Sequence, residues 1–238
     1  MVMQLIRKIK QRFQVLAGKK TLIKKELDCD RAWYGNNYGG FYINPTLLNE
    51  KSIVYSFGIG EDISFDTAII RNHNCQVYAF DPTPKSVNWV NMQSLPPYFK
   101  FYPFGINKTT GFVEFNLPKD KKFVSGSVIN HKNVDDENCI KVPMKSFADI
   151  TLELGHQHVD VLKMDIEGSE YDVIDSLLSS KVQITQILVE IHERFFPNGI
   201  EKTEQLLKIM SHHGYAVFAV SSSLEELSFI KKELMENY

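Results

Sequence analysis

Four short segments of the 238-residue chain carry glycine, acidic or histidine residues directly after an apolar run. In open parallel sheets, ligands bind beyond the carboxyl ends of the strands, so these four turns are the places where we expect chemistry. The segments are Val54–Asp62, Ala79–Asp81, Val161–Glu170 and Leu188–Arg194.

The first two segments together predict a ribose-containing ligand. Gly58 and Gly60 allow a tight turn and bring backbone N–H groups close to a ligand. Asp81 ends the second apolar run, 21 residues after Gly60. An acid at about this spacing accepts hydrogen bonds from ribose hydroxyls. The third glycine of a dinucleotide fingerprint would fall at Ile63, which disfavours a ligand with a pyrophosphate.

The other two segments contain acidic residues and one histidine. Asp165, Glu167 and Glu170 follow the third apolar run, and we expect Glu170 to interact with the positive end of a helix dipole. Glu190 and His192 alternate with apolar neighbours, so both point to one face of their strand end. Our hypothesis is that His192 acts as a general base, oriented by Glu190 or Asp165.

A divalent metal is the alternative interpretation of the same residues. Asp165, Glu190 and His192 could form an oxygen-rich site that lowers the pKa of a bound hydroxyl group. We do not predict a metal as a cofactor on the sequence alone.

Strands that alternate with helices predict an α/β fold with a mostly parallel sheet, covered on both faces. The aromatic and glycine-rich segment 33–41 suits an ordered loop or lid, and residues 119–138 a polar loop. The expected strands are 53–57, 76–80, 99–104, 111–117, 142–146, 159–164, 187–191, 215–220 and 227–231, the last two as a terminal hairpin. The expected helices are 63–73, 85–93, 147–154, 170–179 and 201–213.

Charge and composition indicate an ordinary globular chain. The net charge of −2 gives no indication of nucleic-acid binding, and three widely spaced cysteines fit a reducing compartment. Eight basic residues and no acid precede Glu26, and residues 3–17 read as a basic amphipathic helix. That helix contacts either a membrane surface or its own domain. Basic residues interrupt any signal-peptide core, so we expect a cytoplasmic protein, with peripheral membrane contact through residues 3–17 as the alternative.

Taken together, the four segments resemble the FkbM-type methyltransferase family. The resemblance extends from about Asp28 to about Ser221, and its most specific part is the run from Asp165 to Glu170. It implies a Rossmann-like class I methyltransferase fold with a seven-stranded sheet whose last strand is antiparallel. We therefore expect residues 1–45 to form a helical and loop cap on a methyltransferase domain of residues 46–238, in one compact unit.

The resemblance also implies methyl transfer from S-adenosylmethionine, usually to a hydroxyl group of a small molecule, such as a natural product, or of a sugar or glycan. Gly58 and Gly60 would line the methionine and ribose part, and Asp81 would hold the ribose diol. Pro82 and Thr83 would border the adenine, and Asp165 would lie near the reacting methyl group.

The chain departs from the class I pattern at one position of the expected cofactor site. Ser56 stands where many class I sequences place an acid that holds the amino group of the methionine moiety. Ser56 cannot supply that charge, and Glu61, Asp62 and Asp165 are the candidates to replace it.

Two other classes of function fit parts of the sequence. A Rossmann-type NAD(P)-dependent oxidoreductase shares the sheet but needs the missing third glycine. A non-catalytic nucleotide-binding module keeps the fold, but it has no need for the acidic strand ends beside His192.

Overall fold

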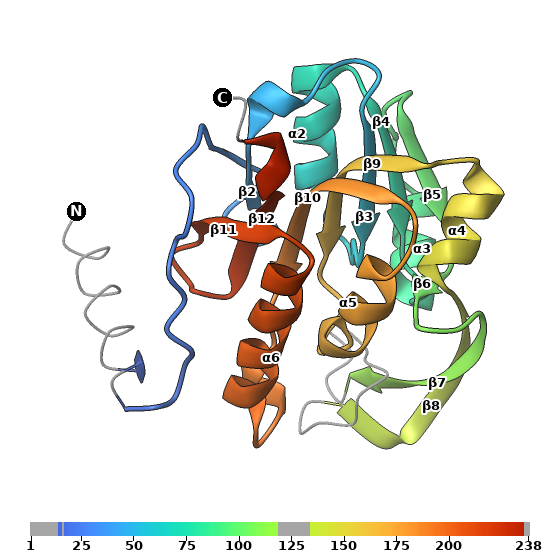
Figure 1. Cartoon of the computed structure of the whole chain (residues 1–238). Coiled ribbons are helices and arrows are strands. Elements are labelled where there is room, and N and C mark those ends of the chain that lie inside the picture. Colours follow the sequence, from blue (N-terminus) through green and yellow to red (C-terminus); the bar gives the residue numbers. More distant parts are fainter. Residues whose placement is uncertain (1–13, 16, 119–133, 236–238) are drawn as a thin grey trace.

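The computed structural model describes residues 14–15, 17–118 and 134–235 of the chain (Figure 1). The strands are β1 (Ala32–Tyr34), β2 (Phe41–Ile43), β3 (Ile53–Phe57), β4 (Gln76–Phe80), β5 (Phe99–Tyr102), β6 (Gly105–Ile106), β7 (Gly111–Pro118), β8 (Val134–Lys145), β9 (His158–Met164), β10 (Gln183–Glu190), β11 (Tyr215–Val220) and β12 (Glu226–Lys231). The helices are α2 (Ser64–His73), α3 (Pro84–Asn91), α4 (Phe147–Leu154), α5 (Glu170–Leu178) and α6 (Gly199–His212), with single 3-10 turns η1 (Pro45–Leu47), η2 (Glu193–Phe195) and η3 (Lys232–Leu234).

Seven strands form the central sheet in the order β11-β12-β10-β9-β3-β4-β5. Strands β5, β4, β3, β9 and β10 are parallel, whereas β12 is antiparallel to both β10 and β11. The predicted α/β class and the seven-stranded sheet with an antiparallel last strand are therefore confirmed. Strand β12 lies between β10 and β11 rather than at the edge of the sheet.

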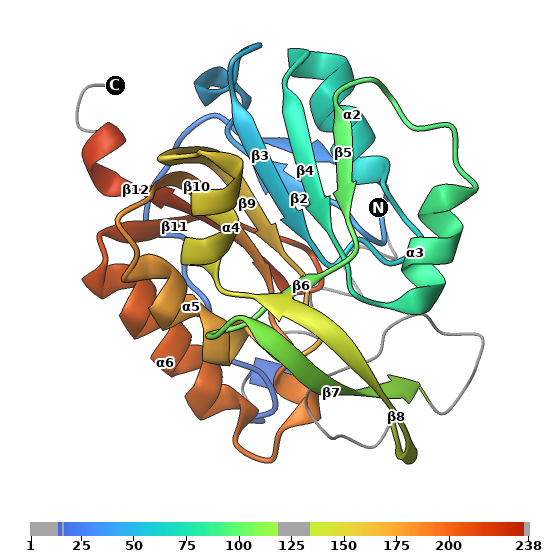
Figure 2. The same cartoon turned by 90° about the vertical axis from the view of Figure 1, so that its right-hand side faces the viewer.

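Apolar side chains cover the sheet on both faces, as continuous apolar strands require. Helices α4, α5 and α6 lie on one face, where Phe57, Leu162 and Val189 belong to the larger core. Helix α2 lies on the other face, together with the β1–β2 hairpin, as the two views in Figures 1 and 2 show. Because all five parallel strands end at the same edge, the residues that follow them come together there.

The predicted ordered loop 33–41 is mainly the connection of a hairpin, with residues 35–40 between two short strands. Strands β1 and β2 pair antiparallel, from Ala32↔Ile43 to Tyr34↔Phe41. Phe41 and Ile43 are fully buried in a second apolar core, on the face of the sheet that α2 covers. Residues before and after position 45, the predicted boundary of the N-terminal cap, share this core. Phe41 and Ile43 lie on the same side of β2 and pack the hairpin against the main sheet. The glycine-rich residues between the two strands form its turn.

A separate three-stranded sheet, in the order β6-β8-β7, flanks the main sheet (Figure 2). Strand β8 begins at Val134, so residues 134–138 belong to a strand and not to the predicted polar loop. Pairing with β7 extends the strand beyond the apolar segment that sequence patterns detect. The rest of that predicted loop and most of the predicted helix 3–17 lie outside the described residues. Among the described residues, no helix is both long and apolar enough to cross a membrane.

Candidate active site

A cavity of about 760 Å³ lies at the carboxyl edge of the parallel strands. Its size falls within the range of small-molecule sites, roughly 300–1,000 Å³. Residues from all four sequence segments line it, as do Phe115 and Met144 from the smaller sheet. The structure thus brings the predicted turns together around one space. The predicted site residues that line it are Gly58, Gly60, Glu61, Asp81, Pro82, Thr83, Asp165 and Glu190.

The two glycines after β3 serve different purposes. Gly58 has a φ of +75°, and a side chain there would overlap the backbone carbonyl of Asp165. Gly60 has a φ of +56°, and a side chain there would meet no protein atom within 4 Å. Gly58 therefore allows β3 and the end of β9 to approach each other, whereas Gly60 leaves space open on the cavity side.

Asp81 joins the turn after β3 to the turn after β4. Its Oδ2 accepts a hydrogen bond from the backbone N–H of Gly60 at 2.9 Å, and its Oδ1 accepts one from that of Thr83 at 2.8 Å. The side chain is 4% exposed, and burial raises the pKa of the carboxyl group while these hydrogen bonds oppose the rise. Each carboxylate oxygen has a further lone pair, so Asp81 can both hold the two turns and accept a ribose hydroxyl.

The residues at the start of α2 fit S-adenosylmethionine better than a dinucleotide. The Oδ1 of Asp62 accepts the backbone N–H of Ser64 at 2.8 Å, so a carboxylate already occupies this helix N-terminus. A pyrophosphate needs those N–H groups and would be repelled by that charge. The open space at Gly60 and the acceptor at Asp81 match a nucleoside without phosphate groups. The structure therefore agrees with the inference, drawn from Ile63, that the ligand has no pyrophosphate.

Ser56 does not reach the cavity, contrary to its predicted role in binding the cofactor. It is fully buried, and it pairs in register with Lys163 on β9. The Nζ of Lys163 donates a hydrogen bond to the carbonyl of Gly58 at 2.7 Å, and its charge opposes the burial that raises the pKa of Asp66 on α2. Sequence reasoning missed Lys163 and Asp66, although a lysine within an apolar strand is a recognisable signal.

The other candidates to replace the missing acid at Ser56 differ in their contacts. Asp62 accepts a hydrogen bond from the side chain of Asn36 at 2.7 Å and so holds the β1–β2 turn. Glu61 lies 3.6 Å from the Nζ of Lys85. Asp165 is 25% exposed and faces the cavity. All three acids line the cavity, and Asp165 is the one that belongs to the cluster with Glu190 and His192.

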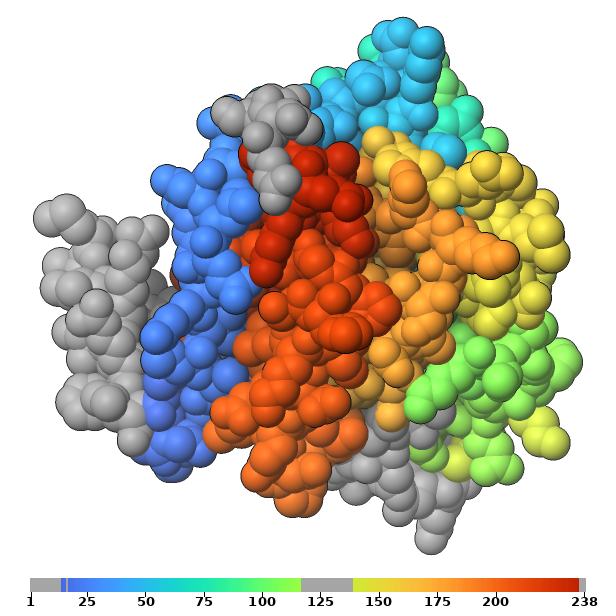
Figure 3. Space-filling model, in the orientation of Figure 1, coloured from blue at the N-terminus to red at the C-terminus, as the bar shows by residue number. Residues whose placement is uncertain are grey.

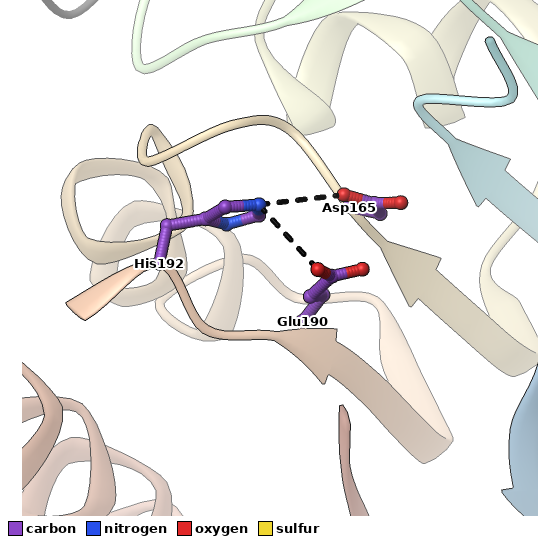
Figure 4. A group of neighbouring side chains, drawn as sticks. All are labelled: Asp165, Glu190 and His192. Atoms are coloured by element: carbon purple, nitrogen blue, oxygen red, sulfur yellow. Dashed lines mark ion pairs between the residues drawn. The ribbon is translucent and has the colours of Figure 1, made fainter. Parts of the chain in front are cut away.

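His192 lies at the centre of an acidic cluster just beyond the ends of β9 and β10 (Figure 4). Its Nε2 lies 3.8 Å from Oδ1 of Asp165, 3.7 Å from Oε1 of Glu190 and 3.4 Å from Oε2 of Glu167. Its ring stacks on Phe195 with centroids 5.0 Å apart. The predicted proximity of His192 to Asp165 and Glu190 is thus present in the structure.

Glu170 holds His192 in this position. Its Oε1 accepts hydrogen bonds from Nδ1 of His192 at 2.9 Å and from the backbone N–H of His192 at 3.0 Å. Its Oε2 accepts the N–H of Gly168 at 2.9 Å, and the side chain is fully buried. The interpretation of Glu170 as a helix-terminal charge was therefore incomplete, because the fold also brings this first residue of α5 to the imidazole that follows β10.

The environment of His192 does not suit a general base that contacts the acceptor. The side chain is 1% exposed and does not line the cavity. Burial opposes its protonation, but the charges of Glu170, Asp165 and Glu167 raise the pKa of the imidazole to about 10. Such a group already carries a proton at neutral pH. His192 thus lies behind its carboxylate neighbours and outside the cavity, and its action as a general base stays a prediction.

Glu190 faces the cavity and has an altered acidity. Burial and the negative charge of Asp165 raise its pKa to about 9. Tyr38, from the turn of the β1–β2 hairpin, is 82% exposed and also lines the cavity. Partial desolvation and the charge of Asp165 raise the pKa of Tyr38. One end of the cavity, at Asp81, therefore suits a nucleoside, and the other end, at Asp165 and Glu190, is acidic.

Comparison with known proteins supplies a family for this arrangement. Residues 49–217 match the model of the Methyltransferase FkbM domain. The human protein named "Probable methyltransferase-like protein 24" is 27% identical over 154 residues, which cover 64% of this chain and 36% of that protein. The rat protein of the same name is 26% identical over 205 residues, covering 82% of this chain and 50% of that protein. The chain thus spans a third to a half of the length of these relatives.

Among solved structures, Aeropyrum pernix fibrillarin in complex with natively bound S-adenosyl-L-methionine aligns with a TM-score of 0.41 and 10% identity. The alignment covers 88% of this chain and 86% of that one.

Proposed function

The chain belongs to the FkbM methyltransferase family, whose methyl donor is S-adenosylmethionine, and on that premise we propose that it methylates a hydroxyl oxygen of a sugar, glycan or natural product. The observation that supports the proposal is the cavity itself. It connects the Gly60 and Asp81 end with the carboxylates of Asp165 and Glu190.

The chain's own residues hold the cofactor at one end. Gly60 would leave room for it, Asp81 would accept hydrogen bonds from the ribose, and Pro82 and Thr83 would border the adenine. Asp165 would take the ammonium group of the methionine moiety in place of Ser56, which does not line the cavity. The bound cofactor supplies a methyl group on a sulfonium, and alignment of the acceptor with that group accounts for up to roughly 7–11 kcal/mol in favourable systems.

Glu190 lines the cavity and takes the proton of the acceptor hydroxyl in this mechanism. Because burial and the charge of Asp165 raise its pKa to about 9, only its deprotonated form can act, and the rate should rise with pH up to about 9. Asp165 stands beside it, and His192 fixes the position of both from behind. The assisted proton transfer is worth about 10²–10⁴ in rate. Tyr38 offers a ring on which a sugar can stack.

Calorimetric titration tests the cofactor. S-adenosylmethionine should bind with 1:1 stoichiometry, NAD should not bind, and Asp81→Asn should weaken binding at least tenfold. Binding of NAD instead would favour the oxidoreductase. A panel of hydroxyl-bearing glycans and small molecules, scored for incorporation of a labelled methyl group, tests the acceptor. Binding of the cofactor without transfer to any of them would favour a binding module.

A further inference from the structure

The unusual feature of the acidic cluster is one buried polar atom, Nε2 of His192. This atom forms no hydrogen bond, although three carboxylate oxygens lie 3.4–3.8 Å away. Those distances exceed the roughly 2.7–3.2 Å of a hydrogen bond from nitrogen to oxygen. Buried polar atoms without a hydrogen bond are rare in native proteins, and each needs an explanation.

The spacing of the side chains fits a metal ion between them. Ligand atoms of Asp165, Glu190 and His192 all lie within 4.8 Å of one another. An ion held at about 2.1 Å from nitrogen and oxygen ligands keeps neighbouring ligand atoms about 3.0–3.4 Å apart. Closing a spacing of 4.8 Å to that range takes a movement of about 0.7–0.9 Å by each of two side chains. Figure 4 shows that the three side chains converge from the ends of neighbouring strands.

The contacts around the imidazole also match those of a metal ligand. Nδ1 of His192 donates to the buried carboxylate of Glu170, so Nε2 is the ring nitrogen that faces Asp165 and Glu190. Metal-binding histidines almost always donate their other ring N–H in this way. The cluster also places four carboxylates around one imidazole, with Arg194 Nη2 3.9 Å from Glu190. A divalent cation balances this excess of negative charge.

We propose that Asp165, Glu190 and His192 bind one divalent transition-metal ion, with Glu170 as the residue that positions the imidazole. One imidazole with two carboxylates suits Mn²⁺ or a neighbouring first-row metal better than an all-oxygen ion such as Mg²⁺. The ion takes the place of the Nε2 proton. With the ion bound, Glu190 is a ligand, and the ion lowers the pKa of the acceptor hydroxyl in its place, a role that rests on the proposed function. Its binding does not depend on that function.

The test is titration of the metal-free full chain with Mn²⁺, followed by calorimetry and electron paramagnetic resonance. One Mn²⁺ should bind per chain, and the spin-echo signal should show a directly bound nitrogen. Glu190→Gln and Asp165→Asn should each weaken binding at least tenfold, and Glu170→Gln about 10–100-fold. Glu225→Gln is the matched control, because Glu225 lines the same cavity but forms ion pairs with Lys20 and Arg194 instead of His192. It should change Mn²⁺ affinity less than threefold.

The outcomes separate the metal site from methyl transfer. Circular dichroism confirms that each variant is folded, and titration with S-adenosylmethionine is run on the same samples. No Mn²⁺ binding at millimolar concentration, or equal binding by wild type and Glu190→Gln, overturns the metal site. S-adenosylmethionine binding without Mn²⁺ binding leaves the proposed function intact. Mn²⁺ binding without S-adenosylmethionine binding overturns the proposed function alone.

Discussion

Individual residues at the site carry more than one task, and their contacts show how the tasks divide. Asp81 connects two turns through Gly60 and Thr83 while facing the cavity. Glu170 is buried and fixes His192, which in turn stands behind Asp165 and Glu190. Residues that face the ligand are thus held by residues that never meet it. Variants of the first group should therefore change mainly ligand binding, and variants of the second group mainly the stability of the fold.

The two glycines after β3 make this separation measurable. Gly58→Ala places a side chain against the Asp165 carbonyl, so we expect a loss of more than 3 kcal/mol in the free energy of unfolding, beyond the roughly 1–2 kcal/mol of a left-handed backbone alone. Gly60→Ala meets no atom of the protein and should cost only those 1–2 kcal/mol. It should nevertheless weaken S-adenosylmethionine binding at least tenfold. Urea unfolding and calorimetry measure the two effects, and equal stability losses would contradict this assignment.

Among the secondary-structure elements, the β1–β2 hairpin combines a structural and a ligand-facing part. Its second strand contributes Phe41 and Ile43 to the core, and its turn carries Tyr38 to the cavity. Asn36 ties the turn to Asp62 at 2.7 Å, so the hairpin is connected to the loop that precedes α2. The segment is therefore an integral wall of the site.

Two substitutions in this hairpin should have opposite consequences. Phe41→Ala removes a fully buried ring and should lower the free energy of unfolding by about 3–5 kcal/mol. Tyr38→Ala removes a ring that is 82% exposed and should change stability by less than about 0.5 kcal/mol. Under the proposed function, Tyr38→Ala should raise KM for the acceptor and leave S-adenosylmethionine affinity unchanged. A loss of cofactor affinity in Tyr38→Ala would show that the ring belongs to the other end of the cavity.

At the scale of the whole molecule, residues 20–28 lie along the C-terminal strands (Figure 3). Glu26 pairs with the edge strand β11, donating its N–H to Val217 O at 2.8 Å and accepting the Val217 N–H at 3.0 Å on its side chain. Lys20 donates to Ser223 O at 3.0 Å. These contacts cover polar groups of an edge strand that would otherwise be open to pairing with another chain.

Neighbouring residues of this segment provide a matched test of its contribution. Ile23 packs against the larger core, whereas Leu22 is 63% exposed. We expect Ile23→Ala to lower the free energy of unfolding by about 1–2 kcal/mol and Leu22→Ala to change it by less than about 0.5 kcal/mol. Urea unfolding of both variants gives the comparison. Equal effects would mean that the segment does not contribute to the folded core.

The sequence by itself determined the alternation of strands and helices, because periodicity of apolar residues is a local property of the chain. Strands β3, β4 and β11 and helix α4 begin and end where their sequence patterns predict. The turns after the strands also follow from sequence, since parallel strands must end at a common edge. The recognition of the FkbM family rests on those same turns.

Only the tertiary structure decided what each residue does within those turns. Ser56 lies beneath the cavity, Gly58 faces a backbone carbonyl, and Glu170 reaches His192 across 22 positions of the chain. The burial of a side chain and the charges around it depend on elements that are distant in sequence. Burial and charge together set the pKa of an imidazole, and so its protonation state. For that reason the sequence located the acidic site around His192, and only the fold placed the imidazole against Glu170 and behind Asp165 and Glu190, as a candidate positioning residue and metal ligand.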